Sequence, residues 1–359
     1  MGKKWKWKVK FRRLSIAAPT ENLLIRLLIL GLAVSATGGA QESAPWHDPS
    51  KHQVQFVTVD DGVRLEVLDW GGSGRSVVLL AGLGFTAHVF DGFAEKLTDS
   101  YHVYGITRRG YGASSQPASG YTEQRLAEDD LRVLDALKLV APVMVGHSIA
   151  GNELSQLGIH HYGRIGGLIY LDALNDATDD YTDYDALCSK LPEAMQKPPT
   201  PSPSDLKSFP AYRAWRLRTQ GIAIPESELR NDFVENLDGS VGSHKTPENV
   251  AHAIMAGGWK HDYSEIRSPV LAFVAYDTPD GPPQDQIRKY HVMDAAERTI
   301  VGAVYGTYIG MARIRIERIN RAAGGARVVE LWGADHFVFL SNEADVLREL
   351  RPFVATLHK

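Results

Sequence analysis

An apolar run that breaks abruptly into a Gly-His-Ser turn is the feature that most restricts how this chain can fold. Residues 141–146 read APVMVG, Ser148 follows at the tip of the turn, and IAGNELSQLG resumes with helical spacing. A buried strand, a sharp turn and a helix are the parts of a nucleophile elbow, which raises a serine hydroxyl above the edge of a sheet. Gly146 and Ala150 are small enough for the crowded backbone of such a turn. By composition alone the pattern arises in roughly one chain in three of this length, so it needs support from other segments.

Strand-like and helix-like patterns alternate on both sides of this turn. The stretch HQVQFVTVDDGVRLEVLDWG contains two alternating runs joined at Asp61-Gly62, a strong hairpin signal. The run RSVVLL consists mainly of β-branched residues and leucine and APVMVG is similar, as expected of strands that are buried on both faces of a parallel sheet. HVYGIT and GGLIYL are further predicted strands. Helical spacing appears between them. We therefore predict an α/β fold in which a mainly parallel sheet is flanked by helices.

The alternation stops over residues 175–267, which contain QKPPTPSPSD, weak helical patterns and many aromatic residues. Long excursions between core elements usually carry function, and we predict an inserted helical cap here. The core is then split into residues 50–174 and 268–359. Its second part contains the strand-like run SPVLAFVAYD, a long helical stretch from about Gln284 to Arg321, the run ARVVELWG and a last helix.

Residues 1–40 have the composition of a secretory signal peptide. A basic start is followed by the apolar run from Leu23 to Ala36 and by small residues, which suits cleavage after Ala36 or Ala40. The run is shorter than the about 20 residues that span a bilayer, and Arg26 interrupts it. We expect an exported protein, periplasmic or extracellular. The alternative is an uncleaved segment that anchors the chain in the membrane.

Charge and cysteine content exclude several classes of partner. The first 40 residues contain eight basic residues and one acid, so their removal takes the formal net charge from −4 to about −11. An acidic protein of this kind is unsuited to nucleic acid or anionic membranes, which leaves a small-molecule substrate. Cys188 is the single cysteine, which excludes an intrachain disulfide or a cysteine metal cluster. We expect neither a metal nor an organic cofactor.

Taken together, these segments resemble the α/β-hydrolase fold superfamily from about Val54 to the C-terminus. The matching motifs are LLAGLG as an oxyanion loop, RRGYGASS, the elbow VMVGHSIAG, VAYD after a late strand, and GADHFVF near the end. Two positions depart from the usual pattern, Ala81 where many members have histidine and Thr107 where aspartate is usual. The resemblance implies a serine hydrolase whose site lies under a cap domain.

The same resemblance assigns roles to individual residues. Ser148 is the nucleophile, and its proton requires a general base. His336 lies in the loop after the last core strand, where the family's base falls. The backbone N–H groups of Leu83 and Ile149 are the expected oxyanion donors, because one follows a glycine in a tight loop and the other begins a helix.

The acid that orients the histidine has more than one candidate. Family order places it between serine and histidine, where Asp277 directly follows the strand VLAFVAY. Asp172, at the end of LIYL, is the alternative, because some members carry the acid one strand earlier. Asp280 and Asp335 are weaker candidates. We choose Asp277 as the acid.

These observations predict an exported serine hydrolase that cleaves a small or medium carboxylic ester, or a related acyl bond, through an acyl-enzyme intermediate. One alternative is an aminopeptidase of the proline-iminopeptidase type, in which Glu226, Glu228 or Asp232 would hold the substrate ammonium. The other is a hydrolase-fold protein that binds a small ligand without turnover.

Overall fold

The computed structural model describes residues 46–176, 179–191, 199–276 and 293–357. Asp48–Lys359 form one compact unit, and the elements below all belong to it. Within the described ranges, no helix has both the length and the apolar character required to cross a membrane.

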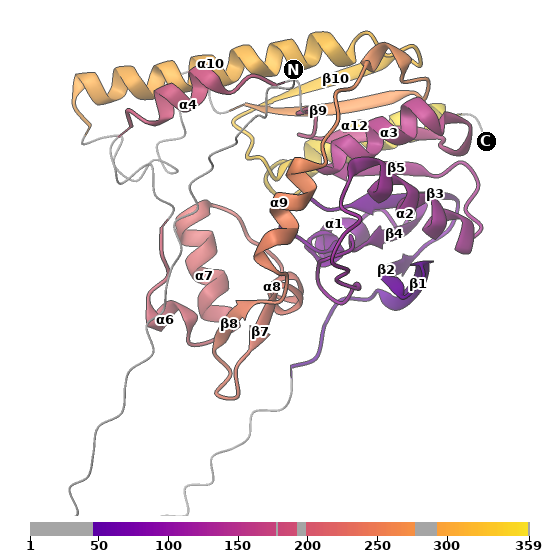
Figure 1. The fold of residues 1–359 in the computed structure, drawn as a ribbon, viewed down its shortest axis with the longest axis horizontal. Helices are drawn as coiled ribbons and strands as arrows, with labels where there is room; N and C mark the ends of the chain where they lie inside the picture. The colour runs from indigo at the N-terminus through magenta and orange to yellow at the C-terminus, as the bar shows by residue number, and fades with distance from the viewer. Residues whose placement is uncertain (1–45, 177–178, 192–198, 277–292, 358–359) are drawn as a thin grey trace, which may run out of the picture. The chain divides into compact units, whose positions relative to one another are not determined.

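An eight-stranded sheet forms the centre of this unit (Figure 1). Its strands are, in chain order, β1 (Gln53–Asp60), β2 (Val63–Gly71), β3 (Arg75–Leu80), β4 (Tyr101–Ile106), β5 (Val143–His147), β6 (Gly167–Leu171), β9 (Val270–Tyr276) and β10 (Ala326–Trp332). Their spatial order is β1-β2-β4-β3-β5-β6-β9-β10. β1 and β2 form the expected hairpin, β2 pairs antiparallel with β4, and all later pairings are parallel.

Helices cover both faces of the sheet, as predicted. They are η1 (Ala87–Phe90), α1 (Asp91–Glu95), α2 (Glu123–Ala136), α3 (Ala150–His160), η2 (Tyr162–Arg164), η3 (Tyr263–Glu265), α10 (Ala295–Ile319), α11 (Val338–Ser341) and α12 (Glu343–Thr356). Alternate residues of the strands enter two separate cores. Leu79 packs in the core that contains α1 and α12, whereas Val78 packs in the core that contains α2, α3 and α10. The apolar runs of β3, β5, β6 and β9 are continuous because these inner strands are buried on both faces.

The chain from β6 to β9 adds no strand to the large sheet within its described residues. It contains α4 (Thr182–Cys188), α6 (Pro203–Leu206), α7 (Phe209–Gln220), α8 (Glu226–Asp232), β7 (Phe233–Glu235), β8 (Val241–His244) and α9 (Glu248–Ala256). The short β7–β8 hairpin was not apparent from the sequence. Tyr212 stacks on Trp215 with ring centroids 5.3 Å apart and meets Phe233 edge-on at 5.2 Å, so these aromatic residues pack with one another rather than line an open pocket.

The long helical pattern near the C-terminus corresponds to α10, which begins later than the sequence suggested. Asp294 caps it, because its side chain accepts from the N–H of Glu297 while the Glu297 side chain accepts from the N–H of Asp294. Residues 277–292, which include the start of the predicted stretch, lie outside the described residues. α10 runs alongside α4 (Figure 1).

Candidate active site

The turn after β5 holds Ser148 in a backbone conformation that a serine rarely adopts. Its φ is +56°, in the left-handed region, and α3 begins two residues later. The sequence has small residues here because space is short. A Cβ at Gly151 would lie 1.8 Å from the carbonyl oxygen of Ala173. The strand, strained turn and helix expected of a nucleophile elbow are therefore all present.

His336, in the loop between β10 and α11, contacts this serine directly. The Ser148 hydroxyl donates to Nε2 of His336 across 2.9 Å. Ser148 is half-buried and the His336 side chain is 46% exposed, so both reacting groups are accessible to a ligand. This arrangement can transfer the hydroxyl proton to the imidazole.

Asp172 occupies the position on the other side of the imidazole. Nδ1 of His336 donates to Asp172 Oδ2 across 2.6 Å, and the second carboxylate oxygen accepts from the N–H of Ala275 at 3.0 Å. β6 ends at Leu171, opposite Phe273 of β9, and β9 continues to Tyr276, past the end of β6. The N–H of Ala275 is therefore free to bind the carboxylate instead of a strand.

The choice of Asp277 as the acid stays a prediction. Asp277 and Asp280 lie outside the described residues, and the imidazole is already paired with the alternative, Asp172. Asp335 accepts from the N–H of Phe337 at 3.0 Å, which satisfies it within its own turn. Among the described carboxylates, the one that pairs with His336 is therefore Asp172, at the end of β6, which the sequence analysis named as the alternative.

The surroundings of His336 favour its protonated form. Burial of the ring lowers its pKa, but the hydrogen bond and the charge of Asp172 outweigh burial, and Asp335 adds to them. The pKa of His336 is therefore raised above its usual value near 6.5. An imidazole of this kind readily accepts a proton from a neighbouring hydroxyl.

Two backbone N–H groups beside Ser148 match the expected oxyanion donors. A Cβ at Gly82 would lie 3.2 Å from the Ser148 Cβ, so the loop after β3 runs directly beside the serine. Among the described residues, the N–H groups of Leu83 and Ile149 have no hydrogen-bond acceptor. Ile149 is the N-cap of α3, where free N–H groups and the positive end of the helix dipole meet.

His147, the residue before Ser148, contacts the loop of His336. Its ring is fully buried, and Nε2 donates to the backbone carbonyl of His336 at 3.1 Å. Because a carbonyl only accepts, Nε2 carries the proton. Burial, together with the nearby charge of His336, lowers the pKa of His147 well below its usual value. A neutral His147 therefore holds the backbone of the loop that carries His336.

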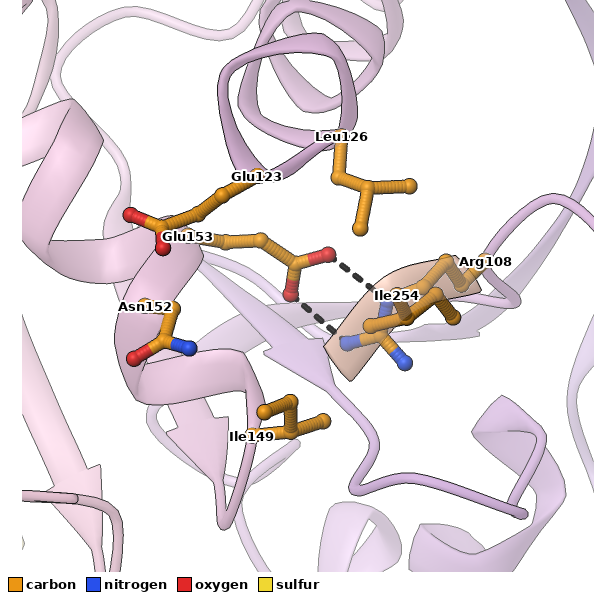
Figure 2. A pocket seen from close by; sticks show the side chains of 7 residues that line it. All are labelled: Arg108, Glu123, Leu126, Ile149, Asn152, Glu153 and Ile254. Carbon is orange, nitrogen blue, oxygen red and sulfur yellow. Dashed lines mark hydrogen bonds and ion pairs between the residues drawn. The ribbon is translucent and has the colours of Figure 1, made fainter. Parts of the chain in front are cut away.

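A buried ion pair fixes the helix behind the elbow (Figure 2). Arg108, from the RRG motif, binds both carboxylate oxygens of Glu153 at 2.6 and 2.7 Å and also donates to the carbonyl of Ala81 at 3.0 Å. Glu153 lies on α3 and Ala81 precedes the oxyanion loop, so one guanidinium joins the two elements that carry Ile149 and Leu83. The pocket in Figure 2 is lined by Arg108, Glu123, Leu126, Ile149, Asn152, Glu153 and Ile254.

The chain matches the model of the alpha/beta hydrolase family over residues 77–349. A protein of Streptomyces lividans named "Non-heme chloroperoxidase" is 26% identical over 71% of this chain and 91% of its own. A protein of Caulobacter segnis named "Putative carbamate hydrolase RutD" is 36% identical over 31% of this chain, and the match covers only 43% of that protein.

Solved structures have the same fold at low sequence identity. The crystal structure of E-2-(acetamidomethylene)succinate hydrolase aligns with 85% of this chain and all of its own, with a TM-score of 0.60 and 17% identity. The family model spans well over half of the chain and includes the serine, the histidine and the aspartate described above. The chain therefore belongs to the alpha/beta hydrolase family.

Proposed function

We propose that this protein is an exported serine hydrolase that cleaves a small or medium carboxylic ester, or a related acyl bond, through an acyl-enzyme intermediate. The observation that carries the proposal is the continuous hydrogen-bonded row from Ser148 through His336 to Asp172. A serine activated by a histidine, which is in turn oriented by a carboxylate, is the arrangement of acyl-transfer enzymes on several unrelated folds.

In the first half of the reaction the Ser148 oxygen attacks the substrate carbonyl while Nε2 of His336 takes the hydroxyl proton. Asp172 keeps the Nδ1 proton directed toward itself, so Nε2 is left as the acceptor, and its charge stabilises the imidazolium. The N–H groups of Leu83 and Ile149 bind the oxyanion. When the tetrahedral intermediate collapses, the carbon–heteroatom bond breaks and His336 returns its proton to the leaving group.

In the second half a water molecule attacks the acyl-enzyme, and His336 takes one of its protons. Collapse then releases the carboxylic acid, and the proton returns to the Ser148 oxygen. All proton transfers therefore pass through one imidazole, and the chain needs no other titrating group for the cycle.

The names of the relatives guide the choice of substrates. They refer to a carbamate and to an acetamidomethylene succinate, so a test panel should contain carbamates and amides as well as esters. A fold shared at 17% identity does not select among these bonds.

The aminopeptidase alternative has less support, because the acids that could hold an ammonium are engaged elsewhere. Glu226 pairs with Arg230 at 2.8 Å, and Asp232 pairs with His244 at 3.0 Å. Glu228 is buried and accepts from both the N–H and the hydroxyl of Thr86. The binding-protein alternative predicts an intact site with no turnover, and it is separated by the experiment below.

We expect Ser148→Ala to abolish hydrolysis while leaving the fold intact, because the half-buried hydroxyl leaves almost no cavity when it is removed. Wild-type and variant protein would be treated with a fluorophosphonate probe and then assayed against nitrophenyl esters of increasing chain length, an aryl carbamate and a prolyl amide. Circular dichroism provides the folding control.

Each outcome of this experiment separates the alternatives. Labelling and ester turnover in the wild type, both lost in Ser148→Ala, support the hydrolase. Labelling without turnover of any substrate favours the binding protein. Preferred cleavage of the prolyl amide favours the aminopeptidase, and full activity of Ser148→Ala would remove this serine from the reaction.

A further inference from the structure

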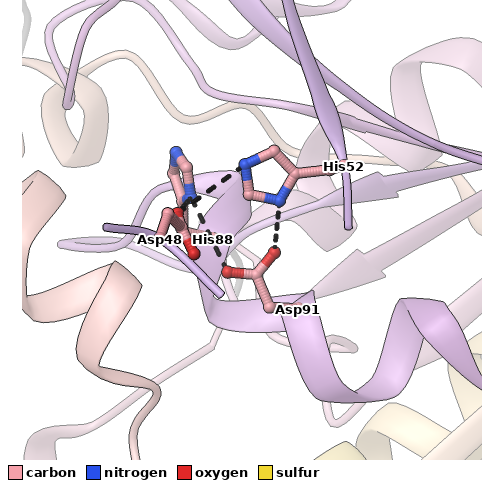
Figure 3. Close-up of side chains that lie close together, drawn as sticks. All are labelled: Asp48, His52, His88 and Asp91. Atoms are coloured by element: carbon pink, nitrogen blue, oxygen red, sulfur yellow. Dashed lines mark hydrogen bonds and ion pairs between the residues drawn. The ribbon is translucent and has the colours of Figure 1, made fainter. Parts of the chain in front are cut away.

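Four side chains with metal-binding chemistry, none of them in the row from Ser148 to Asp172, lie close together (Figure 3). Asp48 and His52 lie just before β1, His88 lies on η1, and Asp91 is the first residue of α1. Each offers one nitrogen or oxygen atom, and the four atoms lie within 4.8 Å of one another. Residues 53–87 separate the two halves of the cluster in sequence.

The separations between these atoms suit ligands of one ion better than hydrogen bonds. Asp48 Oδ2 lies 3.8 Å from His52 Nε2 and 3.8 Å from His88 Nδ1, and His88 Nδ1 lies 3.7 Å from Asp91 Oδ2. All three distances exceed a hydrogen bond. Ligands about 2.0–2.2 Å from a tetrahedral Zn²⁺ are roughly 3.3–3.6 Å apart, so these three pairs need to close by only a few tenths of an ångström, whereas the four atoms as a group lie within 4.8 Å of one another.

The outer sides of both imidazoles are already paired, which leaves their inner nitrogens free to bind. Nδ1 of His52 donates to Asp91 Oδ1 at 2.8 Å, so its Nε2 carries a lone pair. Nε2 of His88 faces Glu66 Oε1 at 3.4 Å, so its Nδ1 carries the lone pair. Metal-binding histidines generally donate their second ring N–H to a carboxylate in this way.

Because it is buried, the inner nitrogen of His88 costs free energy when it has no binding partner. The His88 side chain is 3% exposed, and its Nδ1 is a buried polar atom without a hydrogen-bond partner. Buried polar atoms without a partner are rare and call for an explanation, of which a bound ion is one. This nitrogen points toward the two carboxylates (Figure 3).

Charge is also better balanced with a cation. Asp48, Asp91 and Glu66 bring three carboxylates to this cluster, and none of them forms a salt bridge with a lysine or arginine in the described part of the chain. With both imidazoles neutral, a divalent ion would offset the charges of the two aspartates and leave only that of Glu66. The donor set of two nitrogens and two oxygens suits a borderline cation such as Zn²⁺ better than Ca²⁺ or Mg²⁺.

We propose that Asp48, His52, His88 and Asp91 form a structural zinc site. It revises the expectation from the sequence that the chain needs no metal. With four protein ligands the site is closed, so the ion stabilises the fold and takes no part in hydrolysis. The proposal does not depend on Ser148 being a nucleophile.

The position of the cluster indicates what the ion would hold together. Asp91 also accepts from the Trp70 indole at 3.1 Å on β2 and from the Ser227 hydroxyl at 2.5 Å on α8. His88 lies four residues after Gly84 of the oxyanion loop. One ion would therefore join the segment before β1, the start of α1 and, through Asp91, a helix of the cap.

The rival explanation is an ion-free network in which His88 is protonated. Although burial lowers the pKa of His88, the hydrogen bonds and charges of Asp91 and Glu66 raise it to about 10. A protonated imidazole would draw its acceptors to about 2.7–2.9 Å, whereas the contacts of His88 are 3.4–3.8 Å. Metal content distinguishes the two.

Full-length protein without an affinity tag would be purified from zinc-supplemented cells, and its metal content measured by mass spectrometry. We expect close to one zinc per chain. After stripping with a chelator, added ZnCl₂ should restore that content and raise Tm by roughly 5 °C. Co²⁺ in place of zinc should give the visible absorption bands of a tetrahedral site. A zinc-free wild type that takes up no Zn²⁺ would overturn the proposal.

Variants locate the ion. Asp48→Asn is the first choice, because Asp48 is the most exposed ligand and its amide preserves the shape of the side chain. We expect its zinc content to fall at least tenfold, as in His52→Gln. His102→Gln is the matched control, since His102 pairs with Asp69 at 2.9 Å outside the cluster, and it should keep its zinc.

The remaining outcomes also decide the question. One zinc per chain in Asp48→Asn and His52→Gln would show an adventitious ion at another place, such as the adjacent His160 and His161. Stoichiometric zinc in the wild type with an unchanged Tm would overturn the stabilising role.

Discussion

Strained backbone coincides with two residues of the candidate active site. Among the described residues, four other than glycine have a positive φ, and two of them are Ser148 at +56° and Asp172 at +47°. Each follows the last residue of a parallel strand, β5 and β6, and these strands are neighbours. Strain of this kind costs about 1–3 kcal/mol and persists where the surrounding structure imposes it, which is typical of active sites. The strain therefore supports the assignment of both residues independently of their hydrogen bonds.

Replacement of Asp172 tests the acid. In Asp172→Asn the oxygen can still accept from Ala275, but the amide now donates to Nδ1 of His336, so the imidazole proton moves to Nε2 and cannot be exchanged for that of Ser148. We expect kcat to fall by about 10⁴-fold, the loss that the same change causes in serine proteases. Ester hydrolysis by purified Asp172→Asn, with folding checked by circular dichroism, measures it.

Asp277→Asn is the matched comparison, because it makes the same chemical change at the residue that the sequence favoured. We expect it to retain most of its activity. If Asp277→Asn is inactive and Asp172→Asn is active, the acid follows β9 and the geometry around His336 has been misassigned.

The pH profile reports on the same contact. Hydrolysis needs neutral His336, so kcat/KM falls as the pH drops through the pKa of this residue. Asp172 stabilises the imidazolium and raises that pKa, so the acid limb of the wild type lies above pH 6.5. In Asp172→Asn this negative charge is lost, so the pKa of His336 falls. We therefore expect the acid limb of the variant's residual activity to move to lower pH. A limb that stays in place would contradict a charge effect.

Sequence reasoning named a serine and a histidine that the structure brings into contact, but it chose Asp277 over Asp172 as the acid, for a definable reason. Gly146 and the apolar run before it determine the elbow, and His336 lies in the loop directly after the last core strand. Asp172 and Asp277 both follow apolar strands, so pattern alone does not separate them. The distinction depends on how far β6 extends beside β9, which leaves the N–H of Ala275 free for one carboxylate. Strand length in three dimensions is not encoded in a local motif.

At the level of elements, the site depends on how α3 is held against the loop after β3. Arg108 makes this connection through Glu153 and Ala81, and all three residues are buried. Asp130 lies close enough for its pKa to be raised by burial and by the charge of Glu153. A second set of contacts, from Arg318 and Arg315 of α10 to Asp176 and Asp179, anchors the chain that follows Asp172. Buried ion pairs therefore hold two parts of the candidate site, the helix α3 behind Ser148 and the chain that follows Asp172.

Removal of the Arg108 charge tests the first of these connections. Arg108→Met keeps much of the side-chain volume but leaves the Glu153 carboxylate buried without a partner. We expect the free energy of unfolding to decrease by about 3–5 kcal/mol, the usual result of breaking a buried ion pair from one side. Urea unfolding followed by circular dichroism measures it.

Arg348→Met is the control, since Arg348 forms an exposed pair with Asp345 on α12 and exposed pairs contribute little. Equal unfolding midpoints for the two variants would contradict a structural role for Arg108. Addition of Glu153→Gln to Arg108→Met should recover part of the loss, because it removes the unpaired charge.

Strands could be predicted from the sequence where nearly all of their residues are buried. β3, β5, β6 and β9 have continuous apolar runs, and Gly or Pro residues mark their ends. The β7–β8 hairpin was missed because it is short and pairs with nothing else in the described chain. Its two strands have three and four residues, too few for a period of two to be distinguished from chance.

At the scale of the whole molecule, the four residues of the proposed zinc site could not be grouped from the sequence. Asp48 and His52 are four residues apart and His88 and Asp91 are three apart, spacings that also occur in ordinary helices. Only the packing of the segment before β1 against η1 brings the pairs together. The same packing connects the N-terminal side of the described chain to the loop that carries Leu83.

The N-terminal 40 residues provide a last prediction, which concerns where the protein acts. Seven basic residues among the first 13 precede the apolar run from Leu23 to Ala36, the order of a signal peptide, and the run is too short to span a bilayer comfortably. We expect the exported protein to begin near residue 37 or 41, as N-terminal sequencing of protein from the native host would show. Leu27→Arg combined with Leu28→Arg should block export by breaking the apolar run, while Lys3→Arg, which preserves the charge, should not. Recovery of chains that retain Met1 in the membrane fraction would instead identify the segment as an anchor, leaving the hydrolase site on the outer side of the membrane.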